Sequence, residues 1–491
     1  MAVKTKEEYV ERLKVMNRNV YIGGKKVDRL DERLRPCINV ICVTFDMANN
    51  PEFEDLCTAT SHITGEKVNR FCHIHQSRED LLKKQEMTRI LCHRTGGCIG
   101  RCMGVDAMNA LSVVTKLIDM KYNTNYYERF INYLKHIQAN DLVANCAQTD
   151  VKGDRIKRPH EQRDPDLYLR IVEKRDDGII VRGAKAHNSI APCADEIIAL
   201  PTRNLTKEEG DWAVAFAVPA DDPGVKLVVR PAYLRKRKKL DAPIVNFGTA
   251  ESLTIFDDVF VPWERVFMCG EWEFARALAL LFALYHRHSY TGCKPAVTDV
   301  LCGTAALVAE CNNIERETHV RDKLAKYITI SELVYAAGIA SAHYAFKSPS
   351  GTCIPDPVYV NAGRKIAGEN IYHEYEILTD LAGGLACTLP FEEDFYSEET
   401  GSLLNKYIMR NPNLPPEYVH RAFRLAENIV ASDLTGVFQG AGVHGGGSPI
   451  METITIMASY NIEKVKDIAR YLAGIKKELP RLKREELVKF L

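Results

Sequence analysis

The chain has 491 residues, of which 46% are hydrophobic and 26% charged, as in a globular protein with two or three subdomains. Its 65 basic and 65 acidic residues balance, so overall charge gives no reason to expect binding to nucleic acid or to an anionic membrane. The first residues lack the apolar run of a signal peptide, and no stretch approaches the roughly 18 uncharged residues of a membrane span. We expect a cytoplasmic protein that binds neither nucleic acid nor a membrane.

Fifteen cysteines in a chain without a secretion signal favour free thiols and metal ligands over disulfides. Most are isolated among apolar residues, as Cys37, Cys42, Cys302 and Cys387 are, and we interpret these as small core residues. A thiol-rich protein of this kind suits a reducing, oxygen-poor compartment.

The predicted elements change in kind twice along the chain. Residues 1–140 show helical periodicity, with a helix start at Ser77 followed by an acidic first turn at Asp80. Residues 141–270 are rich in short β-type runs, and the first two runs flank Asp176, Asp177 and Gly178, a hairpin signal. Residues 271–491 return to helical patterns, interrupted by the glycine-rich segment QGAGVHGGGSP. We predict three domains with these bounds: helical, β-rich and a helical bundle.

Two short motifs carry side chains that bind metals. Cys98 and Cys102 form C-x3-C, and His286 and Cys293 form H-x6-C. If the first pair lies on a helix, its side chains project from one face about one turn apart. That spacing suits two different irons of one iron–sulfur cluster, whereas either motif alone occurs more often among core residues.

The second motif needs a change of backbone direction, because two helical turns separate its ligands by roughly 10 Å. Gly292 and Pro295 predict that the helix ends between them, which lets Cys293 fold back toward His286. Three thiolates and an imidazole also suit zinc, and the spacing alone does not exclude that metal. A histidine ligand to a cluster favours catalysis over electron transfer.

Several segments resemble known flavoproteins. DGIIVRGAKAHNS (residues 177–189) and AQTDVKGDR (residues 147–155) resemble the flavin-contacting strands and loop of acyl-CoA dehydrogenases. Together with TSHITGEKVNRFCHIHQSREDLLKKQEMTR, LAGGLACTLP, HGGGSP and the four ligands, the chain resembles the 4-hydroxybutyryl-CoA dehydratase family, whose members also have vinylacetyl-CoA Δ-isomerase activity. That family belongs to the acyl-CoA dehydrogenase-like and 4-hydroxyphenylacetate hydroxylase superfamily. The resemblance implies an α+β fold with an N-terminal helical domain, a β domain for flavin and substrate, and a C-terminal bundle.

The resemblance also implies cofactors, partners and site residues. The cofactors are FAD and a [4Fe-4S] cluster, the substrate is a CoA thioester, and the assembly is a homotetramer built as a dimer of dimers. The implied cluster ligands are Cys98, Cys102, His286 and Cys293. The implied catalytic residues are His286, Tyr290, Glu251, Lys294 and Glu452. The implied flavin-binding residues are Thr149, Asp150, Lys152, Arg155, His187, Ser189, Arg321, Gly383 and Gly384.

The implied reaction is the radical dehydration of 4-hydroxybutyryl-CoA to crotonyl-CoA. An ordinary base does not remove the β-proton near neutral pH, because no adjacent carbonyl activates it. The family's solution is to remove an α-proton and one electron first, which makes the β-proton far more acidic. Hydroxide then leaves from carbon 4 and the electron returns, so the reaction is a lyase reaction without net oxidation.

Two residues depart from the family pattern, and other functions stay open. Gly100 stands where we expect glutamine, which predicts a larger pocket with one polar partner fewer, and Ser189 stands where we expect threonine. Both bear on which acyl group binds. The alternatives are a flavin-only acyl-CoA dehydrogenase or isomerase with structural cysteines, a flavin-dependent aromatic hydroxylase, and, least favoured, a non-enzymatic scaffold.

Overall fold

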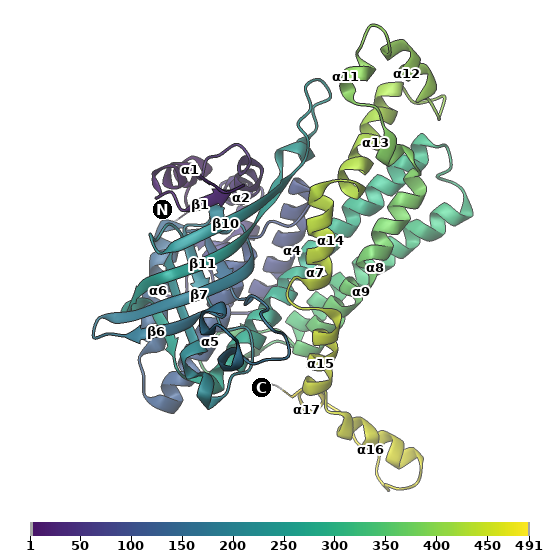
Figure 1. Cartoon of the computed structure of the whole chain (residues 1–491). Coiled ribbons are helices and arrows are strands. Elements are labelled where there is room, and N and C mark those ends of the chain that lie inside the picture. Colours follow the sequence, from purple (N-terminus) through teal and green to yellow (C-terminus); the bar gives the residue numbers. More distant parts are fainter. Residues whose placement is uncertain (1–2, 490–491) are drawn as a thin grey trace.

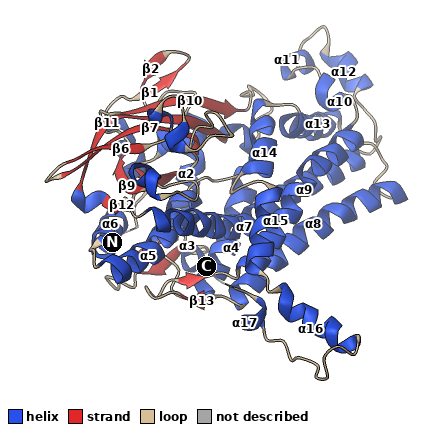
Figure 2. Cartoon of the chain, turned by 60° about the horizontal axis from the view of Figure 1, so that its bottom comes forward, coloured by secondary structure: helices blue, strands red, loops and turns tan. Residues whose placement is uncertain are grey.

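The computed structural model describes residues 3–489, in which the sheets and the long C-terminal helices lie on opposite sides of the molecule (Figure 1). Helices α4 (Arg78–Thr95) and α7 (Ala275–Cys311) pass between them. Coloured by secondary structure, the molecule shows the same separation of strands from the helical bundle (Figure 2). In this described part, no helix is both long and apolar enough to cross a membrane.

The N-terminal part is mostly helical. Its other helices are α1 (Lys6–Val15), α2 (Arg35–Ala48), α3 (Glu54–Cys57), α5 (Cys102–Tyr122) and α6 (Tyr126–Asn140). The predicted helix start is confirmed, since Ser77 Oγ accepts the Asp80 N–H at 3.1 Å and the Asp80 carboxylate accepts the Ser77 N–H at 3.0 Å. Four short strands also occur here: β1 (Val20–Ile22), β2 (Lys25–Val27), β3 (Thr58–Thr60) and β4 (Lys67–Asn69).

Two sheets form the middle of the chain. The larger has the order β2-β1-β10-β11-β7-β6, with β6 (Arg170–Lys174), β7 (Gly178–Ser189), β10 (Val225–Tyr233) and β11 (Gly248–Pro262). The smaller has the order β12-β9-β8-β5, with β5 (Ala144–Ala147), β8 (Glu196–Ala199), β9 (Val214–Pro219) and β12 (Val266–Cys269). The predicted hairpin is confirmed as the antiparallel pair β6 and β7. Because β1 and β2 extend the larger sheet, the N-terminal part contributes to the β layer, and our domain bounds stay a prediction.

The C-terminal part packs around α7. It contains α8 (Thr318–His343), β13 (Phe346–Lys347), β14 (Cys353–Ile354), α9 (Pro357–Ala382), α10 (Leu385–Thr388), α11 (Glu392–Phe395), α12 (Gly401–Tyr407), α13 (Pro416–Val430), α14 (Asp433–His444), α15 (Pro449–Ser459), α16 (Ile462–Leu472) and α17 (Arg484–Leu487). Helix α16 projects away from the body at the bottom of Figure 1.

The predicted end of a helix near Gly292 and Pro295 is wrong, because α7 continues through both for 37 residues. Proline leaves the carbonyl four residues earlier without its helical donor. That carbonyl, of Thr291, accepts a hydrogen bond from Gln85 Nε2 of α4 at 3.2 Å. The neighbouring helix therefore supplies the bond that proline removes, and α7 stays continuous.

Gly292 allows this close approach of α4 and α7. A Cβ atom at residue 292 would lie 2.1 Å from Thr88 Oγ1 and 2.2 Å from the Gln85 carbonyl oxygen. We expect Gly292→Ala to destabilise the protein by about 1–3 kcal/mol, because the backbone of α4 must move. Gly303→Ala is the control on the same helix: nothing lies within 4 Å of its Cβ position, so alanine there should stabilise by about 0.5–1 kcal/mol. Unfolding of the two variants in urea checks the difference, and equal stabilities would contradict the packing argument.

Candidate functional site

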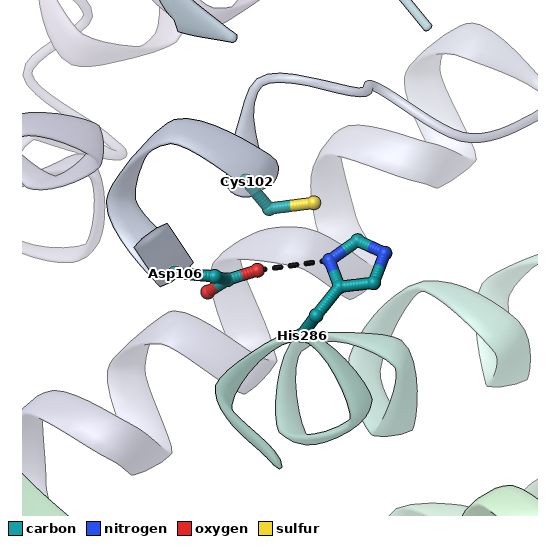
Figure 3. Close-up of side chains that lie close together, drawn as sticks. All are labelled: Cys102, Asp106 and His286. Carbon is teal, nitrogen blue, oxygen red and sulfur yellow. Dashed lines mark hydrogen bonds and ion pairs between the residues drawn. The ribbon is translucent and has the colours of Figure 1, made fainter. Parts of the chain in front are cut away.

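The two metal-binding motifs meet where the loop between α4 and α5 faces α7. Cys102 is the first residue of α5, and one ligand atom each of Cys102, Asp106 and His286 lies within 4.8 Å of the others (Figure 3). Cys98 precedes the helix and lies in the loop, so the prediction that both cysteines share one helix face is wrong. The loop begins at Gly96, whose φ of 70° ends α4.

Cys98 and Cys293 complete the group. Hydrogen bonding with the Cys293 thiol is the largest effect that raises the pKa of Cys98, so the two sulfurs are neighbours. Cys92 of α4 is a further neighbour, and its thiol is the largest effect that raises the pKa of Cys293. We interpreted the cysteines outside the two motifs as core residues and missed Cys92, although it precedes Cys98 by only six positions.

The donor set fits an iron–sulfur cluster. It offers the thiols of Cys98, Cys102 and Cys293 and one imidazole, and thiols of this kind can bind iron as thiolates. The Nδ1 atom of His286 lies 3.0 Å from Asp106 Oδ2, which leaves the Nε2 atom for a ligand bond. His286 and Cys293 stand two turns apart on one continuous helix, about 10 Å by rise, which suits a group of several metal atoms better than one tetrahedral zinc.

Tyr290 and Lys294 follow His286 on the same helix. The Tyr290 hydroxyl donates to the Gly442 carbonyl at 3.2 Å, the Arg364 guanidinium lies 4.4 Å from its ring centre, and burial raises its pKa. Lys294 Nζ donates to Thr298 Oγ1 at 2.6 Å and pairs with Glu374, while burial lowers its pKa. Tyr290 therefore lies beside the group of thiols, and Lys294 is held by a buried carboxylate.

Glu251 lies where β7 and β11 pair, directly opposite Ser189. Its Oε2 accepts a hydrogen bond from Ser189 Oγ at 2.7 Å, and its Oε1 accepts one from Thr249 Oγ1 at 2.9 Å. Burial is the largest effect on its pKa and raises it, while both hydroxyls oppose the rise. Ser189 thus donates to Glu251, a contact that the sequence did not predict.

The glycine-rich segment and Glu452 lie beside α7. Glu452 is fully buried and forms an ion pair with Arg287, whose Nε is 3.1 Å from Oε1. Arg287 Nε also donates to the Gly446 carbonyl at 2.7 Å, and Arg364 donates to the carbonyls of residues 443, 445 and 447. A Cβ atom at Gly446 would lie 3.3 Å from His286 Cδ2, so the segment contacts the site. Neither arginine was predicted.

Some of the predicted flavin-binding residues form one connected group. Asp150 pairs with Lys185 at 2.5 Å, and the carbonyl of Thr149 accepts the Ala186 N–H at 2.8 Å, so this loop lies along β7. The exposed side chains of Lys152 and Arg155 form no hydrogen bond or ion pair with any other residue between 3 and 489. His187 is exposed on β7 with a φ of 58°.

Three other predicted residues lie apart from this group. Gly383 and Gly384 follow the end of α9, where nothing lies within 4 Å of either Cβ position. Arg321 is near the same end, because Lys323 of α8 pairs with Asp380 of α9. Within a single chain these three residues do not lie beside the thiols. Their role in binding flavin stays a prediction.

The larger pocket expected at Gly100 stays a prediction, but the structure shows what occupies the space beside this glycine. The space that a Cβ atom would take is filled by the side chain of Ile190, whose Cγ2 would be 2.5 Å away. The φ of Gly100 is 66°, a conformation that favours glycine. Gly100 therefore lets Ile190 approach the loop that carries Cys98, and any effect of this glycine on specificity stays a prediction.

The hydrogen bond from Ser189 predicts a pH effect. The hydroxyl stabilises the ionised form of Glu251, so Ser189→Ala should raise the pKa of Glu251 further. With Glu251 as a base, the acidic limb of kcat/KM should move to higher pH in Ser189→Ala and stay in place in Ser189→Thr, which keeps the hydroxyl. Measured pH–rate profiles that coincide for all three proteins would contradict this role.

Comparison with known proteins shows which family the chain belongs to. Residues 5–268 match the family model of the 4-hydroxyphenylacetate 3-hydroxylase N terminal and residues 275–474 that of its C terminal. The 4-hydroxybutyryl-CoA dehydratase/vinylacetyl-CoA-Delta-isomerase of Clostridium aminobutyricum is 40% identical over 487 residues, which are 96% of this chain and 99% of the relative.

Two solved structures share the fold. An oxygen-tolerant archaeal 4-hydroxybutyryl-CoA dehydratase from N. maritimus matches with a TM-score of 0.92 and 38% identity over 98% of this chain and 97% of its own. The HpaB oxygenase component of 4-hydroxyphenylacetate 3-monooxygenase, complexed with FAD, matches with a TM-score of 0.83 and 26% identity over 96% and 98%. The chain therefore belongs to the 4-hydroxyphenylacetate 3-hydroxylase family and, within it, to the group of 4-hydroxybutyryl-CoA dehydratase/vinylacetyl-CoA Δ-isomerases.

Proposed function

We propose that this protein dehydrates 4-hydroxybutyryl-CoA to crotonyl-CoA and isomerises vinylacetyl-CoA, with FAD and a [4Fe-4S] cluster as cofactors. The observation that carries the proposal is the convergence of three thiols and one oriented imidazole, from two distant segments, in a chain 40% identical to a dehydratase of that name. Hydroxylation of an aromatic compound by reduced flavin and oxygen does not need such a set of thiols. A complex of one relative with FAD supports the flavin.

The cofactors and the chain have separate tasks in this proposal. When bound, FAD would supply one-electron chemistry and the cluster would supply iron as a Lewis acid for the leaving hydroxyl. The chain holds the cluster with Cys98, Cys102, Cys293 and His286, and it moves the protons. The flavin is expected along β7, beside Thr149, Asp150 and Ser189.

Proton transfer falls to the two buried carboxylates and to the α7 side chains. Burial raises the pKa of Glu251 and of Glu452, so each is suited to take a proton from carbon and to return it. Tyr290, one turn after His286, presents a phenol whose hydroxyl is bonded only to a carbonyl among the residues described. The Lys294 ammonium is paired with the Glu374 carboxylate. We therefore propose that Lys294 positions the part of α7 that carries His286 and Tyr290.

We extend the proposal to a cytoplasmic homotetramer with an acyl-CoA dehydrogenase-like arrangement of domains, which would bring Arg321, Gly383 and Gly384 to a flavin at a subunit contact. These remain predictions from the sequence resemblance.

The experiment is an assay of protein purified without oxygen. Incubation with 4-hydroxybutyryl-CoA should give crotonyl-CoA without any added electron acceptor, and vinylacetyl-CoA should give the same product. A flavin-only dehydrogenase would instead need an acceptor, and an aromatic hydroxylase would need reduced flavin and oxygen. Either of those requirements, with no crotonyl-CoA formed, would refute the proposed function.

A further inference from the structure

A buried network of charged and polar side chains lies behind His286, on three helices. Asp106 of α5 contacts His286 Nδ1 through Oδ2 at 3.0 Å (Figure 3). Its other oxygen, Oδ1, accepts a hydrogen bond from Ser289 Oγ at 2.9 Å and from Lys84 Nζ at 3.3 Å. Lys84 Nζ also donates to Ser289 Oγ at 3.2 Å. The side chains of Asp106 and Lys84 are both 0% exposed.

The burial of these charges needs an explanation. Taking a carboxylate and an ammonium out of water is expensive, and an apolar pair of similar size would often stabilise a fold equally well or better. Asp106 meets this penalty with three hydrogen-bonding partners, supplied by α4 and α7. The arrangement therefore points to a task for the carboxylate beyond stability.

That task follows from which atoms remain free. Both oxygens of Asp106 are already bonded, so this carboxylate is not itself a free ligand for a metal. An ionised carboxylate only accepts hydrogen bonds, so His286 Nδ1–H donates to Asp106, which leaves the lone pair of Nε2 on the other side of the ring. Phe282 stacks on the imidazole, with ring centres 5.6 Å apart and planes 6° from parallel, and so fixes the ring plane.

We propose that Asp106 is a positioning residue for the cluster: with Lys84 as its buried counter-cation, it holds His286 as the Nδ1–H tautomer whose Nε2 binds iron. This inference rests on the proposed function, because it assumes the cluster. It adds that the imidazole is oriented by a carboxylate from the same helix that supplies the Cys102 thiol, so both ligands move as one unit.

The test compares two double variants in which the charges of Lys84 and Asp106 are removed together. Lys84→Met with Asp106→Leu removes the acceptor for His286 and leaves no unpaired buried charge, so folding should survive. Lys84→Met with Asp106→Asn keeps an amide oxygen as acceptor. Glu196→Gln is the control, because Glu196 is a buried carboxylate paired with Arg265 at 2.7 Å in the small sheet, far along the chain from the ligands.

The readout is the rate at which a chelator removes iron from each holoprotein under nitrogen, together with FAD content and the Mössbauer spectrum. We expect the Leu-containing double variant to lose iron about 10–100-fold faster than the wild type, since partners of this kind typically contribute that factor. The Asn-containing double variant should lie between, Glu196→Gln should match the wild type, and all four proteins should keep FAD.

The outcomes separate this inference from the proposed function. A wild type that holds iron and forms crotonyl-CoA, with both double variants releasing iron at the wild-type rate, would overturn the role of Asp106 alone. An equal loss of iron from Glu196→Gln would also overturn it, because the effect would then be general destabilisation. A wild type without iron would overturn both.

Discussion

Replacing Cys293 by alanine is expected to remove the iron and the dehydratase activity together, while FAD stays bound. Cys293 is buried and interacts with Cys98, so it belongs to the group of thiols that the two segments form. Loss of a Lewis acid removes several kcal/mol of transition-state stabilisation, which corresponds to a fall in kcat of about a thousandfold or more. Cys293 is not among the predicted flavin-binding residues, most of which lie on β7 and its neighbouring loop.

Cys311→Ala provides the matched control for this prediction. Cys311 is a fully buried cysteine at the end of the same helix, in a separate apolar cluster with Val308 and Phe423. Its substitution should lower stability slightly and leave iron, FAD and activity unchanged. Measurement of iron, flavin and crotonyl-CoA formation in the two variants checks the contrast. Full activity in Cys293→Ala would favour a flavin-only enzyme with structural cysteines.

Replacing Arg287 by methionine is expected to give the largest loss of stability. Glu452 would then be buried without its cationic partner, and breaking a buried ion pair typically costs about 3–5 kcal/mol. Arg287 also donates to Asn361 and to the Gly446 carbonyl, so the glycine-rich segment loses a donor as well. Arg287→Met with Glu452→Gln should recover much of the loss, because the buried carboxylate that Arg287 neutralises is then also removed.

The loss should depend on pH in a defined direction. Burial raises the pKa of Glu452 above its usual 4.5 and Arg287 opposes that rise, so the substitution raises the folded-state pKa further. Above the unfolded-state pKa the unfolded chain releases a proton that the folded protein still holds, and stability therefore falls as pH rises through the folded-state pKa. Urea unfolding should show a larger deficit, relative to the wild type, near neutral pH than near the unfolded-state pKa of about 4.5.

A control pair separates this effect from the general loss of an arginine. Arg89 pairs with Asp299 at 3.0 Å on the partly exposed face between α4 and α7. Arg89→Met should cost at most about 1 kcal/mol, since solvent screens such pairs. If Arg287→Met and Arg89→Met were equally stable, or if the deficit of Arg287→Met grew toward acid pH, the description of Glu452 as a buried partner would be wrong.

Local signals in the sequence predicted local structure well. The capping pair at Ser77 and the hairpin at Gly178 depend on contacts between near neighbours, and both formed as expected. The convergence of the two metal-binding motifs was predicted from residue types and from the family resemblance. The detailed backbone at the site was predicted less well, because Gln85 of another helix keeps α7 intact through Pro295.

The contacts that orient the site are the part that a single sequence hides. Asp106 and His286 are 180 positions apart, and Arg287 and Glu452 are separated by a comparable stretch. The residues around Asp106 and Arg287 are largely apolar, which indicates buried helices, but nothing near either residue in the sequence identifies its partner. The packing of α4, α5 and α7 shows which charges are paired, and the chain after β7 places Ile190 in the space beside Gly100.

The most direct test of the central claim is the Mössbauer spectrum and the iron and sulfide content of the wild type, grown with 57Fe and purified without oxygen. Cys98, Cys102, Cys293 and His286 as common ligands predict about four irons and four sulfides per chain, with one iron distinct from the other three because it is bound to nitrogen. A yellow flavoprotein without iron and sulfide, or one with a single zinc per chain, would contradict the account.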